Sequence, residues 1–357
     1  MSSSNKIQEG TVSIVIPVYN AATTIEKCIA SLMKQSYQDI HVILVNDAST
    51  DQSVNKLSKL IDLDKRFHLL HQDINKGASA ARNLGTKYGQ GEFLFFLDAD
   101  DWLEQNAIEL LVEHAQKTNS DLVCASHIQD FDHESKQKSD GAPNYDHVFD
   151  DKQLTLYIKS YLKSPYKFTL LVHCWGKLYN LAIVKNNGLR FNETLSQLED
   201  VNFNFQYLVY CKKVAYKWAF IYHHRISSSS QSLSTVMGKE ADATQKFLIA
   251  YQAIEQFLAV HDKEKLINAD KEVSHLFITT IIITLIRLCK SFLKQPSIDV
   301  FNKLTVITKS SEVAKRLPFY TPGPNESRLL FFALKTKTPI VVLLAGLLRA
   351  CVLALTK

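Results

Sequence analysis

The sequence has no Cys-x-x-Cys pair, no glycine-rich phosphate loop and no uninterrupted apolar run long enough to span a bilayer. Its six scattered cysteines argue against both a zinc site and a secreted disulfide framework. The missing Gly-x-Gly-x-x-Gly excludes a Rossmann dinucleotide site, and the missing Gly-Lys-Ser/Thr excludes a P-loop. Residues 1–10 are polar, so no secretory signal is expected there.

Basic residues are concentrated at one end of the chain. The 357 residues carry a formal net charge of +5, but residues 313–357 hold seven basic residues and one acidic residue. Residues 1–312 are therefore close to neutral. No stretch combines clustered basic residues with exposed aromatic residues, so we expect no nucleic-acid partner. The length and the 46% hydrophobic content fit one large globular domain or two domains.

The first 130 residues alternate short apolar runs with amphipathic segments. This alternation predicts an α/β fold, with right-handed βαβ units building a mixed, mainly parallel sheet flanked by helices. The expected strands are 11–17, 41–45, 67–71, 93–97 and 122–126. The expected helices are 23–36, 51–63, 77–88 and 105–118. Thr23 or Thr24 and Ser49 are the expected N-caps of the first two helices.

The later part of the chain divides into a mixed region and a helical region. Residues 130–165 are polar and predict a loop excursion, and 168–178 predict a strand or loop. A helix is expected at 199–211 and a late strand at 214–224, followed by helices at 241–261 and 276–288. We expect a catalytic domain at 1–238, with a nucleotide half at about 11–126 and an acceptor half at about 165–235. Residues 239–357 form the expected helical extension.

Acidic residues follow the second and fourth predicted strands. Asp47 follows the second, and Asp98, Asp100 and Asp101 follow the fourth. Ligands of open α/β sheets lie beyond the carboxyl ends of the strands. Three clustered carboxylates repel one another unless a cation lies among them, and they suit Mg²⁺ or Mn²⁺. The alternative is that these residues only cap the following helix.

Four segments in this order resemble the signature blocks of family 2 glycosyltransferases with the GT-A nucleotide-sugar-binding fold. They are SIVIPVYN (13–20), VNDASTD (45–51), NKGASAARNLG (75–85) and FLDADDW (96–102). CWGKLY (174–179), LEDVNF (198–203) and YHHRISSSSQSLST (222–235) resemble the acceptor-side motifs of non-processive members. The resemblance covers residues 11–235. The Gln-x-x-Arg-Trp motif of processive synthases is absent, which favours addition of a single sugar.

The resemblance implies a site for a UDP-sugar donor. Tyr19 would lie against the uracil ring, and Asp47 would accept a hydrogen bond from the uracil N–H. Arg82 would carry positive charge near the nucleotide or hold the acids in place. Tyr19 as a half-buried core tyrosine and Arg82 as a structural ion pair are the alternatives. The implied donor-side residues are Pro17, Val18, Tyr19, Asp47, Lys76, Arg82, Asp98, Ala99 and Asp100.

Catalysis would need a metal ion and a base. Mn²⁺ or Mg²⁺ held by Asp98 and Asp100 would stabilise the departing diphosphate. Asp200 matches the family's catalytic base, and Glu199 would shape the site or take that role. At most one of His223 and His224 should reach the metal, since consecutive strand residues face opposite sides. The implied acceptor-side residues are Asp101, Trp175, Lys177 and Arg225, although Trp175 is equally compatible with a core position.

The apolar segment 339–355 is short for a membrane span and contains Arg349. It predicts either an interfacial helix on an anionic membrane surface or a helix docked on 276–288. The sequence as a whole predicts a metal-dependent, inverting glycosyltransferase. It would move one sugar from a UDP-sugar to a hydroxyl of a glycan or lipid-linked acceptor of capsule or lipooligosaccharide type. The expected location is cytoplasmic or peripheral on the inner membrane face.

A protein of another class is the alternative: a non-catalytic nucleotide-sugar-binding subunit of a glycosyltransferase complex. The presence of Asp98, Asp100 and Asp200 argues against it, because a protein without catalysis has no physical need for these three carboxylates.

Overall fold

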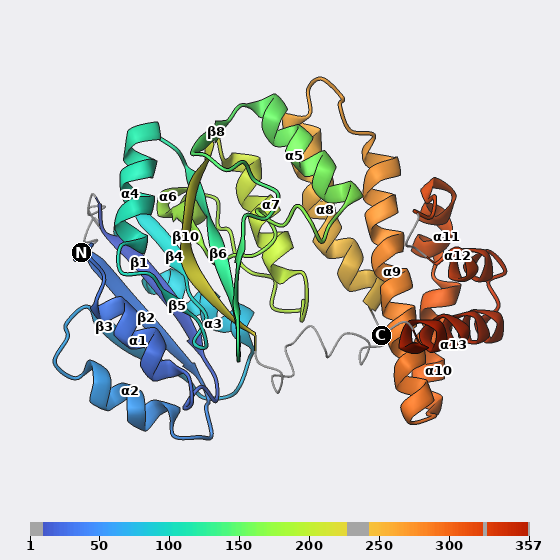
Figure 1. The fold of residues 1–357 in the computed structure, drawn as a ribbon, viewed down its shortest axis with the longest axis horizontal. Coiled ribbons are helices and arrows are strands. Elements are labelled where there is room, and N and C mark those ends of the chain that lie inside the picture. Colours follow the sequence, from blue (N-terminus) through green and yellow to red (C-terminus); the bar gives the residue numbers. More distant parts are fainter. Residues whose placement is uncertain (1–9, 227–242, 324–326, 356–357) are drawn as a thin grey trace. The chain divides into compact units, whose positions relative to one another are not determined.

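The computed structural model describes residues 10–226, 243–323 and 327–355, and these form two compact units (Figure 1). The first, which we call the sheet unit, contains the described residues of 10–154, 166–193 and 199–226. The second, the helical unit, contains 155–165, 194–198 and the described residues from 243 onward.

The described strands of the sheet unit form one sheet in the order β3-β2-β1-β4-β9-β6-β10-β5, with β7 beside β6 and β8 beside β10. Strands β1 to β4 run parallel, while β9 is antiparallel to both its neighbours, β4 and β6. The strands are β1 (Val12–Val18), β2 (Ile40–Asp47), β3 (Phe67–Gln72), β4 (Phe93–Phe96), β5 (Trp102–Leu103), β6 (Leu122–Phe131), β7 (Ser135–Lys138), β8 (His147–Phe149), β9 (Lys177–Asn180) and β10 (Val214–Ile226).

Helices cover both faces of this sheet because its strands are apolar on both sides. Ile14 and Ile16 of β1 belong to the core shared with α1, α2 and α4. On the other face, Gly85 of α3 approaches Val15 so closely that an added Cβ would lie 2.4 Å from a Val15 methyl carbon. The helices are α1 (Ile25–Met33), α2 (Ser53–Ile61), α3 (Ala78–Tyr88), α4 (Ala107–Thr118), α6 (Leu181–Asn186) and α7 (Glu199–Tyr210). This architecture confirms the predicted α/β fold.

Two local predictions were wrong. Residues 130–165 are not only a loop excursion: they contain β7, β8 and the helix α5 (Asp151–Lys163), whose buried face includes Ile158 and Leu162. Ser49 is not an N-cap, because α2 follows Gln52 and the Ser49 hydroxyl accepts a hydrogen bond from the backbone of the β1–α1 loop instead.

Two others were confirmed. Thr24 is the N-cap residue of α1, although its side chain forms no capping hydrogen bond. The segment predicted as strand or loop at 168–178 is irregular up to the start of β9 at Lys177.

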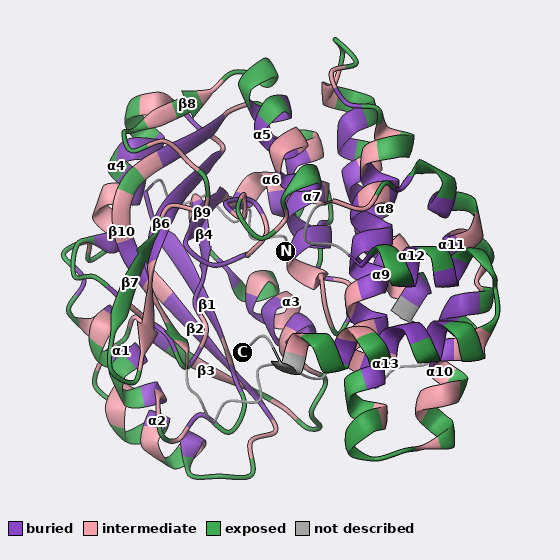
Figure 2. Ribbon diagram, turned by 45° about the vertical axis from the view of Figure 1, so that its right-hand side comes forward, coloured by how far each residue is buried: buried purple, intermediate pink, exposed green. Residues whose placement is uncertain are grey.

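The helical unit is built around α9 (Ala269–Lys294), which is buried along much of its length (Figure 2). In the described part of the chain it is the one helix long and apolar enough to cross a membrane by length and composition, and 61% of its most apolar window is buried inside the protein. Its neighbours include α8 (Ala243–His261), α10 (Ile298–Lys309), α11 (Ser311–Arg316) and α13 (Pro339–Leu355), and α12 (Arg328–Lys335) packs on α13.

Helix α13 presents apolar side chains in two directions. One face, including Val342 and Leu343, is buried, and Gly346 lies directly against Cys289 of α9. The other face exposes Leu344 and Leu348. The helix therefore docks on α9, as one prediction expected, yet retains an exposed apolar face that docking does not use.

Candidate active site

The carboxyl ends of β1 and β2 form one rim of the site. Asn20 and Ala48, just beyond these strands, have φ values of 48° and 56°, a left-handed conformation that turns each strand end sharply. The Asn20 side-chain oxygen accepts a hydrogen bond of 2.9 Å from the Thr50 amide, which joins the two loops. Tyr19 is 50% exposed on this rim, whereas Val18 is buried. Half of Tyr19 is therefore available to a ligand, and its contact with uracil stays a prediction.

Asp47 anchors the loop that leads into α3. Its side chain is only 2% exposed. Its carboxylate accepts hydrogen bonds from the amides of Lys76 and Gly77, both at 2.7 Å, and from Gln72 Nε2 at 3.2 Å. A carboxylate offers about four lone-pair positions, so one is left for a further donor. The contact with uracil stays a prediction, and the structure adds a role that the sequence did not indicate.

Arg82 brings together acids that lie far apart in the sequence. Its guanidinium donates through Nη2 to Asp98 Oδ1 at 2.7 Å, while Nη1 lies 3.6 Å from Asp200 Oδ1 and 3.9 Å from Glu199 Oε1. Burial opposes its charge, but the surrounding anionic groups, Asp98 and Asp200 among them, hold the pKa of Arg82 above its usual value. Arg82 therefore connects the turn after β4 to the start of α7.

Glu199 and Asp200 open α7, directly after Leu198, which has a left-handed φ of 59°. Asp200 Oδ2 accepts a hydrogen bond from the Cys174 amide at 3.0 Å. Asp200 Oδ1 is buried and has no hydrogen-bond partner among the described residues. Burial and the charge of Asp200 raise the pKa of Glu199 to about 7. One oxygen of Asp200 is thus fixed while the other is left with only the nearby Arg82 cation.

Asp100 takes no part in these contacts. Its side chain retains exposed surface, and in the part of the chain that the structure describes it forms no hydrogen bond with another residue. Partial desolvation, followed by the charges of Asp101 and Asp98, raises the pKa of Asp100 to about 7. Ala99, between Asp98 and Asp100, is buried. The raised pKa is the expected result of gathering carboxylates without a cation.

Asp101 fastens the acidic turn to β10. Its side chain is 1% exposed and accepts hydrogen bonds from the Tyr222 hydroxyl at 2.6 Å and the Arg225 amide at 2.8 Å. His224 Nδ1 lies 3.3 Å from the same carboxylate. We predicted that Asp101 contacts the acceptor, but its carboxylate is buried and already accepts these hydrogen bonds inside the protein.

The two adjacent histidines have different surroundings. His223 stacks on Trp102, and its two ring nitrogens lie 2.7 Å from Asp130 and 2.8 Å from Glu104. His224 faces the acidic turn instead. Burial opposes its charge, but the hydrogen bond with Asp101 and the neighbouring carboxylates raise the pKa of His224. His224 is therefore the histidine that lies on the acidic cluster.

The remaining predicted acceptor-side residues are mostly buried. Trp175 stacks between Tyr222 and His173, with ring centroids 4.5 Å apart on each side. Lys177 is buried and donates to the Trp175 carbonyl at 3.3 Å. Of the four residues predicted for the acceptor side, Arg225 is the one with an exposed side chain.

The described residues contain no group of three or more His, Cys, Asp or Glu side chains that could hold a metal ion by themselves. A smaller set fits an ion shared with a substrate, since Mg²⁺ is commonly bound by one or two carboxylates together with phosphate oxygens and water. The uncompensated carboxylate of Asp100 would be one such ligand. His224, whose Nδ1 is held by Asp101, leaves Nε2 as another.

A mixed, mainly parallel sheet with acidic residues at its strand ends is the arrangement expected of the GT-A glycosyltransferase fold. Residues 13–186 match the family model described as "Glycosyl transferase family 2". Over these residues, the match confirms the resemblance to family 2 glycosyltransferases seen in the sequence.

The chain spans less than two thirds of the length of the curated relatives described here. EpsH of Bacillus subtilis, which bears a provisional glycosyltransferase name, is 33% identical over 222 residues, 61% of this chain and 62% of EpsH. The glycosyltransferase GlyA of Streptococcus pneumoniae is 30% identical over 224 residues, 62% of this chain and 31% of GlyA. The crystal structure of S. aureus TarS 1-349 in complex with UDP-GlcNAc has a TM-score of 0.68 at 17% identity, covering 94% of this chain and 90% of that one. That likeness shows the fold.

Proposed function

We propose that this chain transfers a single sugar from a UDP-sugar, with inversion, to a hydroxyl of a glycan or lipid-linked acceptor used for surface polysaccharide. The observation that carries the proposal is the Arg82 bridge, which holds Asp98 at 2.7 Å and Asp200 at 3.6 Å. A donor-side acid and a base candidate are thereby brought to one site. The fold it shares with TarS, which was crystallised with UDP-GlcNAc, supports a UDP-sugar as the donor.

The donor would lie along the carboxyl ends of β1 and β2. Tyr19 offers an exposed ring for stacking on the uracil base, and Asp47 has one lone-pair position left for the uracil N–H. Pro17 and Val18, at the end of β1, would line the pocket for the base. Lys76 would supply positive charge near the nucleotide. Asp98 and Ala99 would complete the nucleotide-binding turn.

Asp100 and His224, with Asp98 nearby, would hold Mn²⁺ or Mg²⁺. Such an ion acts as a Lewis acid that stabilises the negative charge of the leaving diphosphate.

The acid pair on α7 would supply the base. As the acceptor oxygen bonds to the anomeric carbon and the bond to the diphosphate breaks, the hydroxyl proton passes to a carboxylate. We assign this role to Asp200, since the Cys174 amide fixes one oxygen and leaves the other without a hydrogen-bond partner. Glu199, with a pKa of about 7, is the neighbouring group that tunes the charge of the pair. Arg225 has an exposed side chain from which to contact the acceptor.

The proposal is tested by incubating the full chain with UDP-sugars, Mn²⁺ and an extract of cell-envelope glycans, and measuring UDP release and product mass. We expect products exactly one sugar longer than the acceptor. Long polymer would indicate a processive synthase instead. Donor binding without UDP release from any acceptor would favour the alternative, a non-catalytic nucleotide-sugar-binding subunit.

We also propose that the helical region, from about residue 239 to the end, attaches the enzyme to the inner face of the cytoplasmic membrane. Exposed apolar residues on α12 and α13 lie among basic ones, including Lys335 and Lys337, as in helices that bind anionic membrane surfaces. The exposed apolar residues are Leu329, Phe332, Ile340, Val341, Leu344, Leu348 and Val352.

Co-sedimentation with phosphatidylglycerol vesicles tests this attachment. The double substitution Leu344→Ser and Leu348→Ser removes apolar contact without touching the buried face of α13. We expect bound protein to fall about tenfold or more, because each deeply inserted leucine side chain contributes roughly 1 kcal/mol or more. Val260→Ser, at an exposed position of α8, is the matched control and should bind as the wild type does. Undiminished binding of the double variant would contradict membrane attachment through α13.

A further inference from the structure

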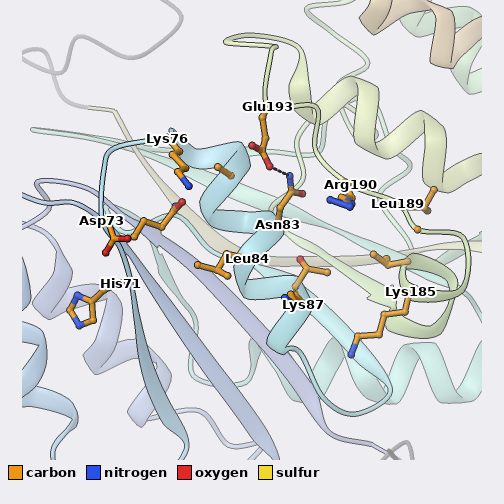
Figure 3. A pocket seen from close by; sticks show the side chains of 15 residues that line it. His71, Asp73, Lys76, Asn83, Leu84, Lys87, Lys185, Leu189, Arg190 and Glu193 are labelled. Atoms are coloured by element: carbon orange, nitrogen blue, oxygen red, sulfur yellow. Dashed lines mark hydrogen bonds between the residues drawn. The ribbon is translucent and has the colours of Figure 1, made fainter.

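The sheet unit contains a pocket that shares only Lys76 with the residues proposed to bind the donor. The pocket, of about 760 Å³, lies between the end of β3, helix α3, helix α6 and the segment after α6 (Figure 3). Its volume suits a small polar ligand. The polar residues that matter for its chemistry are Lys76, Asn83, Lys87, Lys185, Arg190 and Glu193.

Helix α3 separates this pocket from the acidic cluster. Ala80, Asn83, Leu84 and Lys87 line the pocket, and their spacing of three and four residues places them on one face of the helix. Arg82 lies about half a turn away from that stripe and reaches Asp98 instead. The two faces of one helix therefore serve two different sites.

The pocket has an excess of uncompensated positive charge. Four cationic side chains line it, and the side chains of Lys76, Lys87 and Arg190 form no hydrogen bond or ion pair with another residue in the described part of the chain. Lys185 donates to the Gly89 carbonyl at 2.6 Å. Two acids, Asp73 and Glu193, also line the pocket, and Glu193 accepts a hydrogen bond from Asn83 Nδ2 at 2.9 Å. Cations from separate elements around one hollow form an electrostatic site for an anion.

The floor of the pocket is apolar. Val184 and Leu189 are buried beneath it, and Ala80 and Leu84 of α3 form its other side. An apolar floor with a cationic rim suits a ligand that joins a weakly polar body to a phosphate group.

One wall of the pocket is also packed against the candidate active site. The Phe191 amide donates to Asn83 Oδ1 at 2.8 Å, and Asn83 Nδ2 donates to the Phe191 carbonyl at 2.9 Å. The Phe191 ring stacks on Phe203 of α7, with centroids 4.2 Å apart, and the Arg82 guanidinium lies 5.4 Å from that ring. A ligand in the pocket would thus rest on the same segment that supports the acid pair.

From this arrangement we infer that the pocket binds a phosphate group of a ligand other than the donor. Its identification as a phosphate carried by the acceptor rests on the proposed function. The anion binding itself does not, because the pocket lies on the opposite face of α3 from the acidic cluster.

The test measures binding of glycerol 3-phosphate to the full chain by ligand-observed NMR, in the presence of saturating UDP and the diamagnetic ion Mg²⁺, with glycerol as the uncharged probe. We expect glycerol 3-phosphate to bind while UDP is bound, and glycerol not to bind. The double substitution Lys87→Gln and Arg190→Gln should weaken binding about tenfold or more, since it removes two cationic partners of the phosphate. Lys59→Gln, at the corresponding last turn of α2, is the control and should bind as the wild type does.

Displacement of glycerol 3-phosphate by UDP would overturn the inference, because the anion would then occupy the donor site. Unchanged affinity in the double variant, with its circular dichroism spectrum intact, would overturn it as well. A short-chain phosphatidic acid that binds more tightly than glycerol 3-phosphate would assign the phosphate to a lipid carrier, and equal affinity would assign it to a glycan. If binding behaves as expected but no acceptor is glycosylated, the pocket stands and the proposed function fails.

Discussion

Two buried arginines, one in each unit, have similar surroundings and different consequences. Arg82 of the sheet unit is 5% exposed, and Arg316 of the helical unit is 8% exposed. Each guanidinium lies over a phenyl ring, at 5.4 Å from Phe191 and 5.2 Å from Phe277 respectively. Each is also surrounded by more than one carboxylate. Burial and pairing alone therefore do not distinguish a functional arginine from a structural one.

The two arginines differ in how many acids surround them and in how exposed those acids are. Arg316 pairs with Glu255 at 3.0 Å and lies 3.7 Å from Glu312, and both acids reach solvent. Arg82 faces Asp98, Glu199 and Asp200, all less exposed, and further acids lie beyond Asp98. One arginine cannot neutralise that set, as the pKa of about 7 at Asp100 shows. A bound cation, as proposed above, would compensate such an excess of carboxylates.

The largest expected effect concerns Asp200. Asp200→Asn should lower the transfer rate by about 10²–10⁴, the usual contribution of a general base, while UDP binding persists. The measurement is sugar transfer beside calorimetric UDP titration. Glu255→Gln, which changes an acid of the Arg316 cluster, should leave transfer unchanged. Full activity of Asp200→Asn would remove the base assignment, and Glu199→Gln would then be the next variant to assay.

The two arginines should also differ in stability. Arg82→Met leaves several poorly solvated carboxylates unpaired and should reduce the free energy of unfolding by about 3–5 kcal/mol. Arg316→Met should cost less, about 1–2 kcal/mol, because its acids can turn to water. Urea unfolding of the metal-free protein measures both. Equal losses would show that the acids around Arg82 are no less solvated than those around Arg316.

The pH dependence of stability should reveal the raised pKa of Glu199. The folded protein keeps the Glu199 proton up to a pH of about 7, whereas an unfolded chain loses it near its ordinary value of 4.5. The folded state therefore binds more protons between these values, and its stability falls as pH rises through that window. Glu199→Gln should remove most of this pH-dependent loss of stability, which amounts to about 3 kcal/mol over the whole window. Glu255→Gln should not, and an unchanged slope in Glu199→Gln would contradict the raised pKa.

The sequence allowed the parallel half of the sheet to be predicted because its strands are continuous apolar runs between turn residues. The acidic residues at the strand ends could be predicted for the same reason, because they directly follow these apolar runs. Helix α5 was missed because its apolar residues follow a polar stretch, although Leu154, Ile158 and Leu162 have helical spacing. Those positions hold the only regular apolar signal in a segment otherwise typical of a loop.

Burial of the acceptor-side residues could not be predicted from local pattern. Lys177 lies on β9, which enters antiparallel between β4 and β6, and only this tertiary pairing buries its side chain. The same holds for Trp175, which is covered by Tyr222 of β10. Tyr222 itself was detectable, since it shares a strand face with His224 two residues later. A tyrosine on the same strand face as a histidine that reaches an acidic turn is expected to support that turn, as Tyr222 does through Asp101.

The central claim is that the excess of acid around Asp98 and Asp100 is a metal-assisted site for a UDP-sugar. The most direct test is a thermal-shift panel of UDP-, GDP- and dTDP-sugars with and without Mn²⁺, on the wild type and Asp100→Ala. A donor that binds only the folded state raises the melting temperature by mass action. We predict that UDP-sugars give the largest shift, that the shift needs Mn²⁺, and that Asp100→Ala abolishes the Mn²⁺-dependent part. A larger shift with another nucleotide, or one that ignores Mn²⁺ and survives Asp100→Ala, would contradict the account.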